Sequence, residues 1–231
     1  MSQESSFFRT AVLFDELDIR LIVLNIGNHT TFPLLIDTMN LFLKHLHIKK
    51  VHFIGINFGG FVALQIQNSR NILFDIESMI LINAFTTNTY YLHPESTAAK
   101  LFTAIATRTK LEKELEADGL FTEPVTESLK FIRKDINSLD RREAKCRVTL
   151  RQSLTSRIVL HVPDEAVMSI ETMDRKIVLP DIVSETFPDV KLAMMKNGGD
   201  FPHLEAPDDL YPYLLCHIRQ HWKSFQIGQD D

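Results

Sequence analysis

A motif with the spacing of a nucleophile elbow follows a short apolar run in this chain. It reads Gly55-Ile56-Asn57-Phe58-Gly59-Gly60. An elbow of the form Gly-x-Ser-x-Gly turns a strand sharply into a helix, because its small residues let the backbone take strained dihedral angles. Asn57 stands at the nucleophile position, and a carboxamide has no hydroxyl or thiol that a base could deprotonate. The alternative interpretation is a glycine-rich turn without a functional history.

A second motif lies near the end of the chain. It reads Asn197-Gly198-Gly199-Asp200-Phe201-Pro202-His203-Leu204-Glu205-Ala206-Pro207. This loop resembles the Gly-Gly-His-x-Pro-His-Leu-Glu-x-Pro signature of α/β-hydrolases, whose first His is the catalytic base. Asp200 holds that position here. His203 matches the second His, which is usually structural, and a position three residues along the loop is far relative to hydrogen-bond reach. A shifted base at His203 is therefore the less favoured interpretation.

An acidic third member of a triad would follow the next-to-last strand, where Asp174 stands. An acid there orients and stabilises an imidazolium, so Asp174 has no partner of that kind when the base position is Asp200. The alternative is a solvated loop carboxylate. We therefore expect a degenerate triad, at Asn57, Asp174 and Asp200, with no catalytic residue, no cofactor and no metal. The elbow and loop residues expected to shape the site are Gly55, Gly59, Gly60, Gly198, Gly199 and His203.

Strand and helix patterns alternate along the chain, which predicts an α/β fold with a mostly parallel sheet flanked by helices. The expected strands cover residues 20–25, 50–54, 78–83, 167–173 and 190–195. The expected helices cover residues 5–17, 32–46, 59–69, 179–186 and 210–225. Residues from about 86 to 157 read as a helical cap insertion within a single domain that spans residues 1–231.

Several stretches together resemble one family. They are Ser6-Phe7-Phe8-Arg9, Leu46-His47-Ile48-Lys49-Lys50-Val51-His52, Phe58-Gly59-Gly60-Phe61, Arg147-Val148-Thr149-Leu150 and the loop from Asn197 to Leu204. In their order and spacing, from about Phe7 to about Trp222, they resemble the maspardins, a divergent family with the α/β-hydrolase fold. The resemblance implies that maspardins keep the elbow Ser and carry Asn in place of the catalytic His. This chain departs further from the hydrolase pattern at both positions.

The resemblance also implies that the N-terminal strands of the hydrolase fold are missing here, because residues 5–17 already match its first major helix. One missing strand would lie between residues 20–25 and residues 51–54. Its loss would leave unpaired backbone groups, at about 1 to 3 kcal/mol each, and would remove half of an oxyanion hole worth roughly a hundredfold in rate. Three explanations stay open: the sheet re-pairs without this strand, the chain is a fragment or splice form, or a partner stabilises it.

Composition excludes several classes of protein. The 231 residues are 45% hydrophobic, enough for one sizeable core. A net charge of −5, with no basic face, argues against nucleic-acid binding. Cys146 and Cys216 are far apart in sequence and predict reduced thiols in a cytosolic setting. No secretory signal or stretch long enough to span a bilayer is expected.

The function expected from these features is that of a non-catalytic protein-interaction adaptor. The resemblance to maspardins implies a cytoplasmic protein that is recruited to endosomal or trans-Golgi membranes and binds receptor cytoplasmic tails, such as that of a T-cell co-receptor. The pocket around Asn57, Asp174 and Asp200 is one candidate binding surface. Two alternatives stay open: a weak serine-independent esterase in which Asp200 holds a water, and a non-functional truncated isoform.

Overall fold

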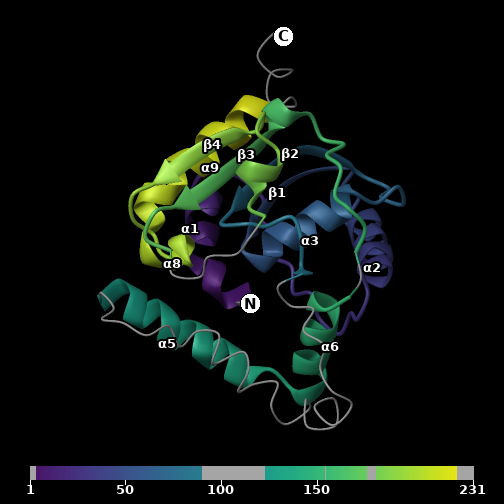
Figure 1. The fold of residues 1–231 in the computed structure, drawn as a ribbon, viewed down its shortest axis with the longest axis horizontal. Helices are drawn as coiled ribbons and strands as arrows, with labels where there is room; N and C mark the ends of the chain where they lie inside the picture. The colour runs from purple at the N-terminus through teal and green to yellow at the C-terminus, as the bar shows by residue number, and fades with distance from the viewer. Residues whose placement is uncertain (1–3, 90–122, 154, 176–180, 223–231) are drawn as a thin grey trace.

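A parallel four-stranded sheet forms the centre of the molecule (Figure 1). The computed structural model describes residues 4–89, 123–153, 155–175 and 181–222. In spatial order the strands are β1 (Lys50–Ile56), β2 (Asp75–Ile82), β3 (Val167–Thr172) and β4 (Lys191–Met195). Every neighbouring pair is parallel, with one register shift between β1 and β2. The alternation of strands and helices predicted from the sequence is confirmed for these four strands.

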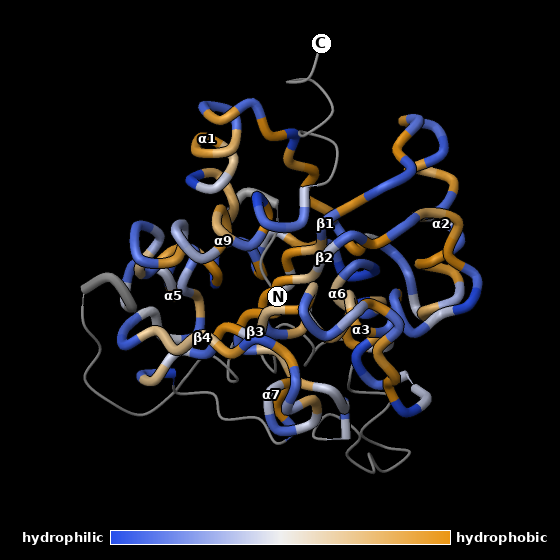
Figure 2. The backbone as a smooth tube through the Cα atoms, turned by 90° about the horizontal axis from the view of Figure 1, so that it is seen from above, coloured by the Kyte–Doolittle hydropathy of each residue, from blue (hydrophilic) through white to orange (hydrophobic). Residues whose placement is uncertain are grey.

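Helices cover both faces of this sheet, with α1 and α9 on one side and α2 and α3 on the other (Figures 1 and 2). The strands lie in the mainly hydrophobic centre of the molecule (Figure 2). The helices that cover the sheet are α1 (Phe8–Glu16), α2 (Phe32–His45), α3 (Phe58–Gln67) and α9 (Pro207–His221). The other helices described are η1 (Glu4–Phe7), α5 (Glu123–Ser138), α6 (Arg141–Arg151), η3 (Asp164–Ala166), α7 (Val183–Thr186) and α8 (Pro202–Glu205).

Strand β2 explains why the sheet needs cover on both faces. Met79 and Leu81 belong to the core under α2 and α3, whereas Ile80 and Ile82 belong to the core under α1 and α9. All four side chains are 0% exposed. Successive side chains of a strand point to opposite faces, so a strand buried on both sides must be apolar at every position. The continuous apolar end of β2 meets this requirement.

The strand predicted over residues 20–25 is wrong, because residues 19–26 have no regular secondary structure. A strand requires a hydrogen-bonded neighbour. Among the described residues, the backbone of residues 20–26 makes no hydrogen bond with another backbone group, and β1 is an edge of the sheet. Leu24 in this segment is 46% exposed despite its hydrophobic side chain.

The part of the predicted cap that the structure describes contains α5 and α6. Helix α6 begins after Asp140, whose carboxylate accepts a hydrogen bond from the Glu143 N–H at 2.7 Å. Helix α5 packs on the body of the protein through an apolar cluster that includes Ile132, Ile136 and Phe201. The rest of the predicted cap, residues 90–122, lies outside the described residues, and the boundaries of the cap stay a prediction.

Candidate functional site

Asn57 is the single residue between the end of β1 and the start of α3. Its backbone has φ 50° and ψ −118°, a conformation that non-glycine residues rarely adopt. Its N–H donates to the carbonyl of Ile82 at 2.8 Å, and its own carbonyl accepts from the N–H of Gly60 at 3.0 Å. Such a strained residue persists only where the surrounding structure holds it. The chain therefore retains the backbone geometry of an elbow.

Two of the three elbow glycines are required by close backbone packing. A Cβ atom on Gly55 would lie 2.5 Å from the Cα of Gly60, and a Cβ on Gly60 would lie 2.4 Å from the Cβ of Ala84. A Cβ on Gly59 would meet nothing within 4 Å. Gly55 and Gly60 thus permit the tight approach of strand and helix, whereas Gly59 has room for a side chain.

The Asn57 side chain reaches the loop that follows β4. Its Nδ2 donates to the backbone carbonyl of Asp200 at 2.7 Å. This bond joins the nucleophile position of the elbow to the position at which the hydrolase signature places its catalytic His. The contact is made with the backbone of Asp200, so it transfers no proton and instead holds the loop against the elbow.

The Asp174 carboxylate also binds this loop through backbone groups. Its Oδ1 accepts from the N–H of Gly199 at 2.8 Å, and its Oδ2 accepts from the N–H of Gly198 at 3.3 Å. Both glycines have positive φ, 139° at Gly198 and 56° at Gly199. The structure thus brings the loop after β3 to the loop after β4, and these contacts give the Asp174 carboxylate an anchoring role. Hydrogen bonds to charged acceptors are among the stronger ones in proteins.

Asn83 and Thr172 complete this set of contacts, and sequence reasoning missed both. The Asn83 Nδ2 donates to the Thr172 Oγ1 at 2.9 Å and to the carbonyl of Gly199 at 3.0 Å. The Thr172 Oγ1 also donates to that carbonyl at 2.6 Å. Both residues are buried at the carboxyl ends of neighbouring parallel strands. Their position at the end of an apolar run could have identified them, because the carboxyl ends of parallel strands meet at one edge of the sheet.

His203 lies in the packing between α8 and the N-terminal segment. Its side chain is 1% exposed, its ring stacks on Phe7 at 4.8 Å between centroids, and its Nε2 lies 3.4 Å from the Ser6 Oγ. Burial lowers the pKa of His203 to about 3. The imidazole is therefore neutral at physiological pH, and its ring packs against Phe7.

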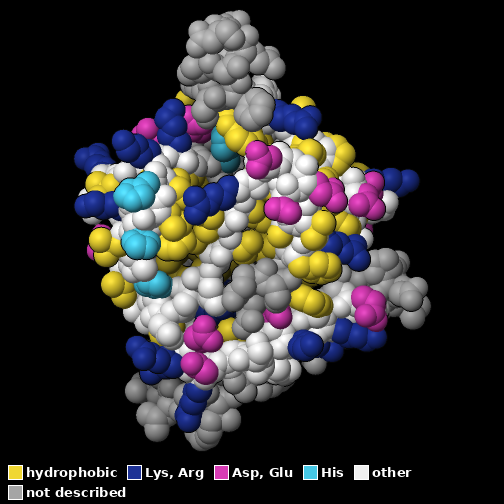
Figure 3. Space-filling view, turned by 180° about the vertical axis from the view of Figure 1, so that it is seen from behind, with side chains coloured by type: hydrophobic (Ala, Val, Ile, Leu, Met, Phe, Trp, Pro, Cys, Tyr) yellow, Lys and Arg dark blue, Asp and Glu magenta, His cyan; other side chains and the backbone are white. Residues whose placement is uncertain are grey.

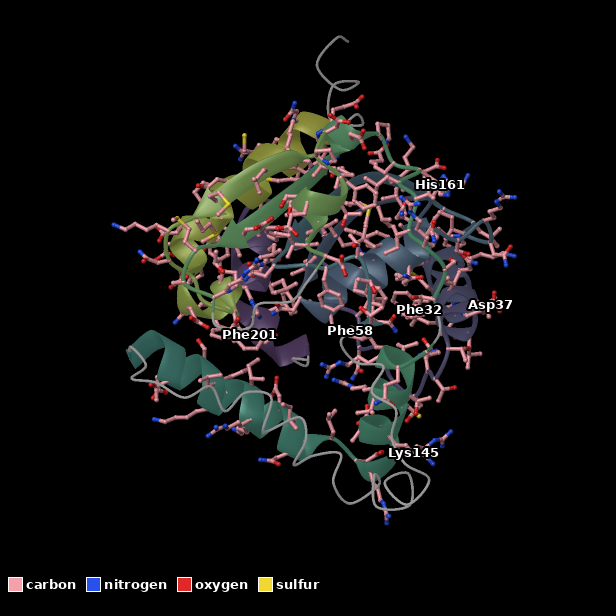
Figure 4. All side chains as sticks on the ribbon, viewed as in Figure 1. Phe32, Asp37, Phe58, Lys145, His161 and Phe201 are labelled. Carbon is pink, nitrogen blue, oxygen red and sulfur yellow. The ribbon has the colours of Figure 1, made fainter. Side chains whose placement is uncertain are left out.

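A cavity of about 460 Å³ opens beside the elbow and extends along β1. Asn57, Phe58 and Gly59 line its inner end, together with Phe201 and His203. The lining contains neither Asp174 nor Asp200. Figure 4 shows Phe58 and Phe201 at the same end of the sheet, the end that faces α5 and α6. The cavity is thus mainly apolar at this end, and Asn57 contributes an amide to its wall.

The described part of the chain contains neither a candidate metal site nor a candidate membrane-spanning helix. Within it, no group of three His, Cys, Asp or Glu residues is placed to hold a metal ion. Among the helices that the structure describes, none has the length and apolar character to cross a membrane. Cys146 is buried and Cys216 is exposed, and both are free thiols.

The sequence of this chain is similar to curated maspardins, although no protein-family model matches it. It is 25% identical to maspardin of Danio rerio over 198 residues, which cover 80% of this chain and 60% of the relative. It is 23% identical to maspardin of Homo sapiens over 228 residues, which cover 93% of this chain and 70% of the relative. The chain thus spans about three fifths of the length of the zebrafish protein.

Solved structures with the same fold are hydrolases and related enzymes. A bromoperoxidase from Bacillus anthracis superimposes with a TM-score of 0.69 at 13% identity, covering 94% of this chain and 88% of its own. A carboxylesterase from Nitrososphaera gargenis superimposes with a TM-score of 0.63 at 16% identity, covering 95% of this chain and 87% of its own. At these identities the comparison establishes the α/β-hydrolase fold.

Proposed function

We propose that this chain, a maspardin-like member of the α/β-hydrolase fold superfamily, is a pseudoenzyme that works by binding other proteins. The observation that carries the proposal is the hydrogen bond from the Asn57 Nδ2 to the carbonyl of Asp200 at 2.7 Å. Asn57 places a carboxamide at the nucleophile position, and this group has no hydroxyl or thiol that a base could deprotonate. The elbow therefore supports the loop structure and has no attacking atom.

The acid position supports the same conclusion. The Asp174 carboxylate accepts two backbone hydrogen bonds from Gly198 and Gly199, so it orients a loop. A triad requires a base within hydrogen-bond reach of the nucleophile and an acid within reach of the base. Here Asp200 stands in place of that base, and its backbone carbonyl accepts the hydrogen bond from Asn57. These contacts give the three positions a shared structural role.

Ester turnover is the measurement that tests the proposal. Purified protein is assayed on nitrophenyl esters of short acyl chains beside Asn57→Gly and Asp200→Ala variants. Glycine suits the positive φ at position 57, so it removes the amide without adding backbone strain. We expect all three proteins to match the buffer rate. Turnover that collapses in either variant would instead establish a hydrolase with altered chemistry, including one in which Asp200 holds the attacking water.

The resemblance to maspardins supports a more specific proposal about the cellular role. We propose that the chain is a cytoplasmic adaptor that is recruited to endosomal or trans-Golgi membranes and contacts cytoplasmic tails of receptors. Recruitment is tested by following a fluorescent fusion against endosomal and trans-Golgi markers. A uniform distribution that no receptor tail alters would contradict this cellular role while leaving the catalytic question to the ester assay.

A further inference from the structure

The cavity that begins at the elbow continues beside β1 as a long slot. One wall is the segment 19–26, all of whose residues line the cavity, and the opposite wall is β1. Figure 3 shows hydrophobic side chains on both sides of a hollow in this face of the molecule. We refer to the space between residues 19–26 and β1 as the slot.

Backbone groups on both walls of the slot lack backbone partners among the described residues, although the carbonyl of Ile26 contacts the His29 Nδ1. Residues 20–26 make no backbone–backbone hydrogen bond, and β1 pairs with β2 alone. The carbonyl of Lys49 and the N–H of Asn57 both bind β2 residues. Since backbone groups alternate in direction along a strand, the odd-numbered residues of β1 face β2. His52 and Ile54 therefore direct their backbone N–H and C=O groups into the slot.

The two faces of the slot are covered by apolar side chains. On one face these side chains belong to helices α2 and α3, namely Met39, Leu43, Val62, Ala63 and Ile66. On the other face they belong to α1 and α9, namely Phe14, Leu210, Leu214 and Ile218. A chain segment in the slot would be buried on both faces, as β2 is. Such a segment must be apolar at successive positions.

The charged residues that line the slot are all basic. They are Arg20, Lys50 and Arg147, and the lining contains no Asp or Glu. This contrasts with the net charge of −5 carried by the whole chain. Arg20 is the second residue of one wall and Lys50 is the first residue of β1; the Lys50 Nζ also donates to the Glu77 Oε1 at 2.7 Å. An occupant with an acidic residue beside Arg20 or Lys50 would be complementary to that side chain in charge.

We propose that the slot binds an extended segment of a partner protein, which adds as a strand to the free edge of β1. The segment would have an acidic residue followed by about six apolar residues, which together match the 7 residues of β1. This inference rests on the proposed binding function and names the chemistry of its partner. An acyl chain would fill the apolar space but would leave the backbone groups of His52 and Ile54 unpaired, whereas a peptide satisfies both requirements.

Tryptophan fluorescence provides a direct readout, because Trp222 is the single tryptophan of the chain and lines the slot. The intact chain is titrated with a peptide of one acidic and six aliphatic residues that carries a solubilising tail. The matched control has the same side chains but is N-methylated along the aliphatic run. We expect saturable binding of the first peptide and at least about tenfold weaker binding of the second, because N-methylation removes the donors of a strand. Equal binding of both peptides would overturn the proposal.

Two variants at one position test the same edge from the protein side. Ile54→Pro removes the N–H that faces the slot and leaves the ladder with β2 intact, as proline requires on an edge strand. Ile54→Ala removes a similar amount of side chain and retains the N–H. We expect Ile54→Pro to weaken peptide binding at least about tenfold relative to Ile54→Ala. Equal affinities would overturn the pairing, and the N-methylated peptide tests it without altering the fold.

Other occupants of the slot would give different results in these experiments. A response of Trp222 to decanoic acid without a response to peptide would replace the proposal with an acyl-binding cavity. Dimerisation in sedimentation that Ile54→Pro abolishes, without binding of peptide, would replace it with a second copy of the chain. Absence of peptide binding together with absence of ester turnover would remove the slot proposal and leave the proposed function standing. Ester turnover lost in Asn57→Gly would remove the proposed function whatever the peptide does.

Discussion

Three residues that stand at triad positions contribute to one structural unit in this protein. Asn57 binds the carbonyl of Asp200, and Asp174 binds the N–H groups of Gly198 and Gly199. The loop after β4 is thus held from the elbow on one side and from the loop after β3 on the other. The residue types at the two hydrolase-like motifs predict the loss of the nucleophile and the base, and this stays a prediction. The hydrogen bonds could not be predicted, because they join residues 143 positions apart and depend on loop geometry.

His203 makes a prediction at this scale about the pH dependence of stability. Burial lowers its pKa to about 3 in the folded protein, against about 6.5 for an unperturbed histidine. Between these values the unfolded chain binds a proton that the folded chain does not. The free energy of unfolding should therefore be unaffected by His203 above about pH 6.5 and should fall as the pH falls toward 3. At pH 5 the expected loss is about 2 kcal/mol.

Urea unfolding at pH 7.5 and pH 5.0 measures this loss, with His203→Gln as the matched variant. The variant should lose less stability than the parent between the two pH values. A smaller loss should remain, because burial also lowers the pKa of His217, to about 4. The same change in both proteins would show that His203 is accessible to protons in the folded state.

Elements of the fold differ in how far sequence could predict them. Strands β2, β3 and β4 were predicted from their runs of apolar residues; the end of β2 is covered on both faces, whereas the edge strand β4 leaves Leu192 and Met194 exposed. Residues 20–25 have the same apolar character, yet they form no strand, because β1 pairs with β2 alone. Apolar character predicts burial, whereas strand formation also requires a neighbour at the right distance. Local sequence cannot supply that second condition.

The contact between the elbow and the end of β2 gives a prediction at the scale of elements. Gly60→Ala would place a Cβ atom 2.4 Å from the Cβ of Ala84 and should destabilise the protein by about 1 to 3 kcal/mol. Combining it with Ala84→Gly removes the opposing Cβ and should recover part of this loss. Gly59→Ala is the matched control, because its Cβ would meet nothing within 4 Å. That variant should be stabilising by about 0.5 to 1 kcal/mol, as is usual within a helix.

Thermal or urea unfolding of the four variants measures these differences. The double-mutant cycle isolates the interaction between positions 60 and 84, since each single change alters one side of the contact. Additive effects of Gly60→Ala and Ala84→Gly would show that the side chains at positions 60 and 84 do not interact. The close approach of α3 to the sheet would then have no role in fixing the elbow.

Two cores, one on each face of the sheet, organise the whole molecule. The core under α2 and α3 and the core under α1 and α9 meet across β2, whose residues Met79 to Ile82 are fully buried. At β1 the separation is incomplete, because apolar side chains of both layers line the slot along one edge of the sheet. The α/β class and the order of elements could be predicted from alternating patterns. The slot lies where the resemblance to the hydrolase fold indicated a missing strand, between residues 20–25 and residues 51–54, whereas the side chains that line it could be identified only from the structure.

Hydrogen exchange should show this asymmetry within a single strand. The amides of Phe53 and Gly55 face β2 and should be protected, whereas those of His52 and Ile54 face the slot and should exchange at least about tenfold faster. Residues Met79 to Ile82 of β2 should show no such alternation, because they have a partner strand on each side. Amide exchange followed by nuclear magnetic resonance resolves neighbouring residues and can test the pattern. Equal protection along β1 would mean that its outer edge is already paired in solution, and the slot would then be closed in the free protein.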